Sequence, residues 1–397
     1  MNFKLALAAA AVVGLAGTAQ AADLAKKAPA AANYVKVCDA YGAGFFYIPG
    51  SDTCLKLGGF VRAEYRIYGG NRNAVAGNPG WTNRNANGIT TRARADFNLD
   101  ARTNTEMGLL RSYIDIWFTA DSAGNGTTNG VNPITSLRKA FVQFGGLTAG
   151  RATSFFDFYT GATNSVYHMA ASDANINLLA YTYSFGNGIT ASLSIEDSSS
   201  SDEANVGARR TYGPYAGVKT PDLVGNIAIT QAWGSAQVMA ALHDDYSSVG
   251  AGGLDKDKLG YAVGAGVKIN LPMLAAGDVL ALQAAYSKGA IGYVFGYTRP
   301  ATYPWYDFRV NAAGTDLVQS SAWAIAGGLT HNWTKQIGTT IAASYFDYDD
   351  GVTSAADLKK TDVQGNVVWK PVTGLAFTAA VEYQHVDRKS PLADGDA

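Results

Sequence analysis

Hydrophobic and polar residues alternate along much of the chain with a period of two. Between 55 and 67 one face is apolar or small, whereas the other carries Lys56, Arg62, Glu64 and Arg66. Similar alternation occurs at 89–100, 110–118, 190–196, 259–269 and 375–384. Such alternation is typical of β-strands with one apolar face. The pattern predicts an all-β chain with about fifteen strands and no helical repeat.

Two kinds of connection separate these predicted strands. Short connections, such as "FGNGIT" and "KPVTGL", roughly alternate with long polar ones along the chain. The long connections cover 69–88, 121–133, 197–213, 244–257 and 289–319. Short turns at one end and long loops at the other are typical of membrane-spanning barrels. We therefore predict a transmembrane antiparallel up-and-down β-barrel over 55–397.

Alternation by itself also fits a soluble β-sandwich, in which the apolar face would form a shared core. Three features favour the barrel. The strands are close to the length that crosses a membrane. The apolar face carries Ala, Gly and Val as freely as Leu, which lipid tolerates and a close-packed core does not. Aromatic residues near strand ends resemble interfacial girdles: Tyr181, Tyr183, Trp233, Tyr286, Trp323, Trp333, Trp369 and Tyr383.

The N-terminus and the composition fit an exported protein. Lys4 precedes an apolar run, Leu5–Gly17, and 19–21 has the small-x-small form of a cleavage site. We expect 1–21 to be a signal peptide and 22–54 to be a lead-in with a disulfide loop. Charged residues make up 16% of the chain and the net charge is −1, so nothing points to a nucleic-acid partner.

The chain has two cysteines, Cys38 and Cys54. A closely spaced pair in an exported chain predicts one disulfide, which would contribute roughly 3 kcal/mol through loop entropy. The alternative is two buried free thiols. Because no histidine nearby completes a ligand set, we expect no metal site.

Arginines gather on the polar faces of the first predicted strands. Sequential antiparallel strands usually pair, so these side chains should line one wall. The alternative is an ordinary solvated face with scattered cations. The residues are Arg62, Arg66, Arg92, Arg94 and Arg111.

The stretch 153–177 has no clean period and contains Asp157, Asp173 and four aromatic residues between 155 and 159. A long connection that contains several aromatic residues usually forms a defined, packed structure. We predict that it folds inward, packs on the wall and narrows the lumen, with its carboxylates facing the arginines. Opposed charges across a constriction would orient polar solutes and discriminate between ions. An ordinary surface loop is the alternative.

Two motifs resemble a known family. "VCDAYGAGFFYIPGSDTCLKLGGFVRAEY" resembles the N-terminal signature of the general porins of alpha-proteobacteria, and "FGGLTAGRATSFFDF" resembles the passage into their constriction loop. The resemblance implies a sixteen-stranded homotrimeric barrel in outer-membrane lipid whose third outer loop enters the pore. It also implies passive diffusion of small hydrophilic solutes and ions, without cofactor or catalysis. By this resemblance the acidic constriction candidates are Asp157 and Asp173, and the basic ones are Arg62, Arg66, Arg92, Arg94, Arg111 and Arg151.

An outer-membrane β-barrel enzyme and a β-sandwich adhesin are the alternative functions. Nucleophilic catalysis needs a serine with a positioned base. The chain has no Gly-x-Ser-x-Gly elbow, and its four histidines stand in unrelated contexts. Planar-bilayer conductance would separate a pore from both alternatives.

The C-terminal residues depart from the family pattern. Such porins end in an alternating strand with a final aromatic residue, whereas this sequence ends in "DRKSPLADGDA". We expect the closing strand to be missing from these 397 residues, unless an N-terminal segment, Tyr34–Val37 or Phe45–Ile48, takes its position.

Overall fold

The computed structural model describes residues 36–68, 88–122, 133–161, 169–199, 209–210, 214–249, 253–295, 305–353, 356–389 and 395–396. The predicted signal peptide lies outside these ranges. The strands are β1 Phe46–Tyr47, β2 Cys54–Ile67, β3 Ile89–Thr105, β4 Gly108–Asp121, β5 Ile134–Phe144, β6 Leu147–Thr153, β7 Asn175–Gly186, β8 Ile189–Glu196, β9 Asp222–Gln231, β10 Gly234–Asp244, β11 Leu259–Asn270, β12 Val279–Lys288, β13 Phe308–Val310, β14 Leu317–Gln319, β15 Ser321–Asn332, β16 Ile337–Asp349, β17 Leu358–Val372, β18 Leu375–Arg388 and β19 Gly395–Asp396. Two 3-10 turns are η2 Asp39–Tyr41 and η6 Ile291–Tyr293. No helix among these residues has the length and apolar character to cross a membrane.

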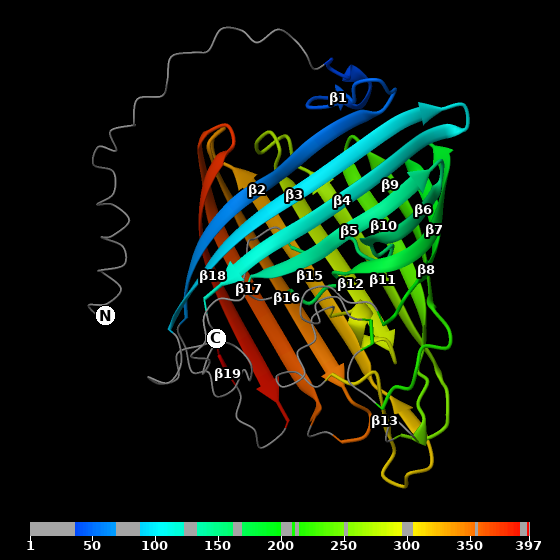
Figure 1. Cartoon of the computed structure of the whole chain (residues 1–397). Helices are drawn as coiled ribbons and strands as arrows, with labels where there is room; N and C mark the ends of the chain where they lie inside the picture. The colour runs from blue at the N-terminus through cyan, green and yellow to red at the C-terminus, as the bar shows by residue number, and fades with distance from the viewer. Residues whose placement is uncertain are drawn as a thin grey trace, which may run out of the picture.

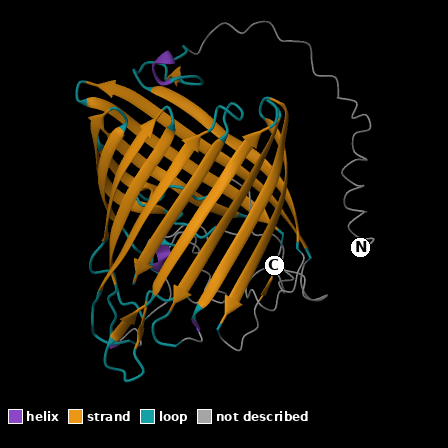
Figure 2. Ribbon diagram, turned by 180° about the vertical axis from the view of Figure 1, so that it is seen from behind, coloured by secondary structure: helices purple, strands orange, loops and turns teal. Residues whose placement is uncertain are grey.

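The long strands form one antiparallel meander. Each pairs with the next from β2 to β12, β12 then pairs with β15, and the order continues to β18. The tilted sheet curls into a barrel (Figures 1 and 2). In the part of the chain that is described, the wall has fifteen long strands, β2–β12 and β15–β18, which agrees with the sequence prediction.

The two ends of the barrel differ, as predicted. Tight turns such as 105–108 and 186–189 lie at the end that also carries β1, and the strand ends that lead into the long connections lie at the opposite end (Figure 1). The turn between β7 and β8 contains Asn187 and Gly188, both with positive φ (52° and 76°). An Asn-Gly pair accepts this backbone at little steric cost, so the local sequence selects the turn.

The apolar face of the wall points outward. On β2, Val61 and Tyr65 are 87% and 83% exposed, although both lie on the hydrophobic face of the strand. A soluble sandwich would bury that face in its core, whereas a membrane barrel turns it to lipid. All eight aromatic residues predicted to form girdles are also exposed: Tyr181, Tyr183, Trp233, Tyr286, Trp323, Trp333, Trp369 and Tyr383.

The N-terminal segment lies at the short-turn rim (Figure 1). Cys38 and Cys54 form the predicted disulfide, with a Cα–Cα distance of 6.0 Å, and Phe45 is buried beside them. Strand β1 pairs with only the first two residues of β2. Within the described residues no ladder joins β18 to β2, and β18 instead pairs with β17 and with the short β19.

The largest hydrophobic core lies inside the barrel at the long-loop end. The connection between β12 and β15 was expected to be a polar loop, but it contains η6 and the β13–β14 hairpin. Its Phe295 and Trp305 are buried against Phe346 and Tyr348, which point inward from β16. This connection therefore fills part of the lumen beside β15 and β16.

Candidate functional site

The connection between β6 and β7 runs through the interior of the barrel. We call its described residues, 154–161 and 169–174, the inner loop. Polar side chains of six wall strands, β8–β12 and β16, bond to its backbone, so it is fixed to the side of the wall that runs from β8 to β16. These bonds include Asn226 Nδ2 to Phe155 O (2.6 Å), Lys268 Nζ to Phe158 O (2.8 Å), Tyr159 N to Gln283 Oε1 (2.9 Å) and Ala170 N to Ser344 Oγ (3.0 Å). The predicted inward fold of this loop is therefore present.

Aromatic side chains anchor the inner loop to the wall. Phe156 is fully buried. Phe158 packs against Gly266 of β11, where an added Cβ would lie 2.3 Å from the ring. Tyr159 packs against Gly328 of β15, where an added Cβ would lie 2.1 Å from the hydroxyl. At these two glycines the absence of a side chain leaves the space that the rings of Phe158 and Tyr159 occupy, and any larger residue would fill it.

The carboxylate of Asp157 is bound within the protein. It accepts hydrogen bonds from Ser172 Oγ and from the backbone N–H of Ala174 (2.6 Å), and Arg209 lies 3.2 Å away. Burial opposes the charge on Arg209, yet the carboxylate of Asp157 holds the pKa of this fully buried guanidinium above its ordinary value. Asp157 therefore closes the inner loop on itself and ties it to the segment that carries Arg209.

A cavity of about 290 Å³ separates the inner loop from the wall formed by β3, β4 and β5. The inner loop contributes both predicted aspartates, Asp157 and Asp173, together with Phe158. The wall contributes five side chains that the sequence analysis did not select: Asp96, Asp115, Trp117, Arg138 and Lys139.

A β-bulge places two adjacent cations on the cavity side of β5. Asp115 is opposite Lys139 and Ile116 is opposite Leu137, so Arg138 has no partner in the ladder. A residue inserted in this way changes the direction of its neighbours. Arg138 and Lys139 therefore line the same cavity, although strict alternation would place one of them toward lipid.

Trp117 lies between two guanidinium groups. Arg94 stands 3.8 Å and Arg138 4.1 Å from the ring centroid. Arg94 also donates to Thr119 Oγ1 at 2.9 Å and is buried. Arg94 thus supports the indole from behind, while Arg138 reaches the cavity.

Other predicted arginines are paired with acids on their own wall. Arg62 and Arg66 both contact Glu64 on the same strand. Arg92 forms two 2.6 Å hydrogen bonds with Asp121 of β4. These charges are largely neutralised where they stand, and none of these residues lines the cavity.

The remaining two predicted arginines also lie outside the cavity lining. Arg111 shares the carboxylate of Asp100 with Arg102, with distances of 2.9 and 2.8 Å for the two ion pairs. Arg151 donates from Nε to the carbonyl oxygen of Leu137 at 2.9 Å. The structure therefore brings together the two predicted aspartates but not the six predicted arginines.

The long-loop end contains a second buried polar network. Tyr215 lies within hydrogen-bond distance of His243 Nε2 (2.9 Å), Asp245 Oδ1 (3.1 Å) and Asp307 Oδ2 (2.8 Å). His243 Nδ1 lies 2.8 Å from Asp222. Burial and the nearby carboxylates hold the pKa of Tyr215 well above its ordinary value. The network joins three of the long connections and narrows this end of the barrel.

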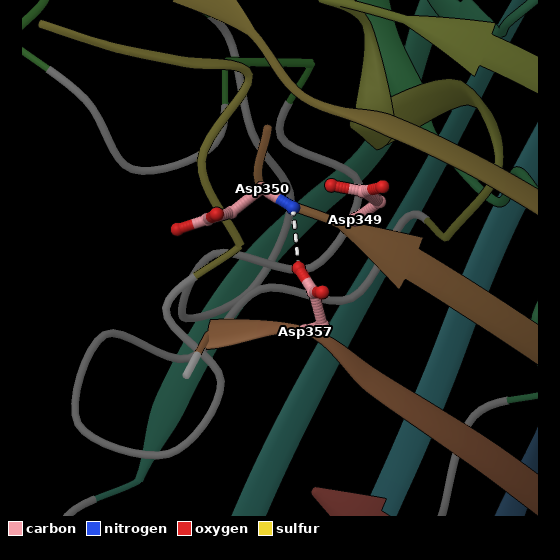
Figure 3. Close-up of side chains that lie close together, drawn as sticks. All are labelled: Asp349, Asp350 and Asp357. Carbon is pink, nitrogen blue, oxygen red and sulfur yellow. Dashed lines mark hydrogen bonds between the residues drawn. The ribbon is translucent and has the colours of Figure 1, made fainter. Parts of the chain in front are cut away.

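A cluster of three carboxylates lies where β16 passes to β17 (Figure 3). Oxygens of Asp349, Asp350 and Asp357 lie within 4.8 Å of one another. Arg309 stands 3.4 Å from Asp350, and Lys389 donates to Asp357 at 3.0 Å. The backbone N–H of Asp350 also donates to Asp357 at 3.0 Å. These contacts link the end of β16 to the start of β17.

Comparison with known proteins identifies the family. A family model described as a porin subfamily matches residues 23–396. Porin Omp2b of Brucella abortus (strain 2308) is 29% identical over 394 residues, covering 96% of this chain and 92% of the relative. Porin Omp2b of Brucella neotomae is 32% identical over 244 residues, covering 59% and 64%.

The fold has a solved counterpart as well. The outer membrane channel DcaP of Acinetobacter baumannii matches with a TM-score of 0.65 and 19% identity, covering 88% of this chain and 96% of that one. At this identity the likeness concerns the fold alone. Because the family model spans nearly the whole sequence, this chain belongs to the porin subfamily and is an outer-membrane channel, not an enzyme.

Proposed function

We propose that the cavity between the inner loop and β3–β5 is the narrowest part of a pore for small hydrophilic solutes and ions. The observation that carries this proposal is the attachment of the inner loop to the opposite wall. Side-chain hydrogen bonds from the wall strands and two aromatic anchors hold the loop there, so its other edge faces the charged wall across the cavity of about 290 Å³.

The field across this passage comes from both of its sides. Asp96, Asp115 and Asp173 contribute negative charge, and Arg138 and Lys139 contribute positive charge. The charge of Asp157 is compensated by Arg209. Four of the predicted arginines are compensated by acids on their own wall: Arg62, Arg66, Arg92 and Arg111. The acids in the passage therefore outnumber its cations, and we propose a moderate preference for cations.

Reversal potentials in asymmetric KCl test this arrangement. Lys139→Gln should increase the cation preference, and the double variant Asp96→Asn with Asp115→Asn should decrease it. Arg92→Gln and Arg111→Gln should have smaller effects, because each leaves behind a partner carboxylate that lies outside the cavity. Equal reversal potentials for wild type and all of these variants would contradict the proposed passage.

We also propose that the chain assembles as a homotrimer. Residues 134–144 of β5 pair with β4, but only 140–144 also pair with β6. The β6-facing edge of 134–139 therefore has no ladder within the described residues, and unpaired backbone groups in lipid are costly. A neighbouring subunit would cover this unpaired edge. In a closed cyclic assembly every subunit makes the same contact with its neighbour, so this one kind of interface is enough.

Gel electrophoresis tests the assembly. Unheated samples should migrate at roughly three times the 41.6 kDa of the chain and collapse to the monomer on boiling. A species that stays monomeric in mild detergent while conducting normally would refute the trimer.

A further inference from the structure

The lining of the constriction cavity includes buried polar atoms that have no hydrogen-bond partner among the described residues. Asp96 Oδ1 and Asp115 Oδ1 are buried and receive no hydrogen bond in the described structure. The Lys139 ammonium group makes no hydrogen bond or ion pair with any described residue. Trp117 Nε1, a donor in the same lining, is also buried without an acceptor. Acceptors and donors are thus left without protein partners in one small space.

The arginines of the neighbouring strands are placed differently. The arginines of β2, β3 and β4 each reach a carboxylate or a hydroxyl within one strand of their own position. In the cavity, the carboxyl groups of Asp96 and Asp115 lie within hydrogen-bond reach of one another and repel one another when both are ionised, but the Oδ1 atom of each has no donor. Lys139 is attracted by Asp115 and Asp173 without contacting either. A buried polar group without a partner is costly, so these atoms favour a solute that supplies the missing bonds.

The required solute has a charge of each sign. A group with several N–H donors would satisfy the two aspartates, and a carboxylate would accept from Lys139 and from the indole N–H. The charges run in order across the wall, with Asp96 on β3, Asp115 and Trp117 on β4, and Lys139 on β5. A dipolar solute would therefore align across the wall, with its cationic end toward β3. A volume of about 290 Å³ has room for roughly ten water molecules, enough for a small hydrated solute.

We propose that this cavity is a transient binding subsite for zwitterionic solutes of the α-amino acid class. The inference rests on the proposed function, because it assigns a ligand class to the same passage. A simple cation would satisfy the aspartates and leave Lys139 without a partner. A simple anion would do the reverse and face three carboxylates. Only a solute with both charges meets both halves of the lining.

Single-channel recording of the full chain tests the subsite with four probes of similar size at neutral pH. The probes are L-alanine (both charges), lactate (carboxylate alone), isopropylammonium (ammonium alone) and glycerol (no charge). L-Alanine should reduce the conductance to a plateau, and the other three should approach no plateau over the same range. Lys139→Gln, and separately Asp96→Asn with Asp115→Asn, should each raise the half-saturating L-alanine concentration about fivefold.

Matched controls change the same charges outside the cavity. Lys335→Gln and Asp52→Asn alter exposed residues at the short-turn end and should leave the half-saturating concentration within about a factor of two. Saturation by lactate or isopropylammonium as strong as that by L-alanine would overturn the proposal in favour of a simple ion site. Conductance without any saturation would overturn the subsite alone. A folded, heat-modifiable protein that fails to conduct would overturn the proposed passage together with it.

Discussion

Replacing Gly266 with alanine is expected to displace the inner loop from the wall. Gly266 has no positive φ, so alanine is compatible with its backbone, and the effect is purely steric. The new Cβ would lie 2.3 Å from Phe158 Cδ1 and 2.7 Å from Cε1, and real Cβ atoms essentially never approach closer than 3.0 Å. Either the strand or the ring must therefore move.

The ring is expected to move, because β11 is held by ladders on both sides. Strand β11 pairs with β10 and β12 through almost its whole length. The inner loop near Phe158 is held mainly by side-chain bonds from Lys268 and Gln283. Overpacking of this kind costs about 1–3 kcal/mol, which corresponds to a shift of roughly 5- to 150-fold between docked and displaced loop.

A displaced loop would move toward β3–β5 and reduce the cavity. We therefore expect Gly266→Ala to lower the single-channel conductance and to increase the open-channel current noise. Gly365→Ala is the matched control, because its added Cβ would have no neighbour closer than 3.9 Å. Phe158→Ala should relieve the clash, so the double variant should conduct like Phe158→Ala alone. Gly266→Ala channels identical to wild type, or effects of the two changes that simply add, would refute this reasoning.

Three further perturbations test other parts of the molecule. Replacing Cys38 and Cys54 with serine should cost about 3 kcal/mol by loop entropy, visible as a lower unfolding temperature with unchanged conductance. Arg209→Met leaves Asp157 buried without its cation and should destabilise the fold by about 3–5 kcal/mol, measured by heat modifiability on gels. Burial raises the pKa of Asp245 to about 8. Its ionised form is therefore disfavoured in the folded loops, so raising the pH from about 5 to about 9 should lower the amide protection factors there, measured against the intrinsic exchange rate at each pH, and Asp245→Asn should remove this loss of protection.

The sequence predicted the wall well because two solvents act on it. Lipid on one side and water on the other impose a period of two, so the alternating stretch at 375–384 begins at the first residue of the observed β18 and ends four residues before its last. The Asn-Gly turn after β7 was recognisable for a similarly local reason. Connections carry no such period, and the buried η6 segment with its aromatic neighbours was therefore mistaken for a polar loop.

The site was predicted only in outline, because its details depend on contacts distant in sequence. The aromatic residues at 155–159 indicated an inward fold, but nothing local pairs Asp157 with Arg209, which lies 52 positions further along the chain. The adjacent Arg138 and Lys139 were the available signal for the cavity wall. Two neighbouring cations within an alternating strand violate the pattern, and a β-bulge is the simplest way to keep both out of lipid.

The bulge also explains why charges of both signs gather beside the inner loop. In a regular lumen wall, inward residues of neighbouring strands stand opposite one another, so acids and bases can pair across the ladder, as Arg92 and Asp121 do. The extra residue in β5 disturbs this correspondence beside Asp115. Arg138 and Lys139 then face the same space as Asp96 and Asp115, and the field of these charges extends into the passage. A change that restores regular pairing in β5, such as deletion of Arg138, should therefore weaken ion discrimination more than neutralising any paired arginine of the wall.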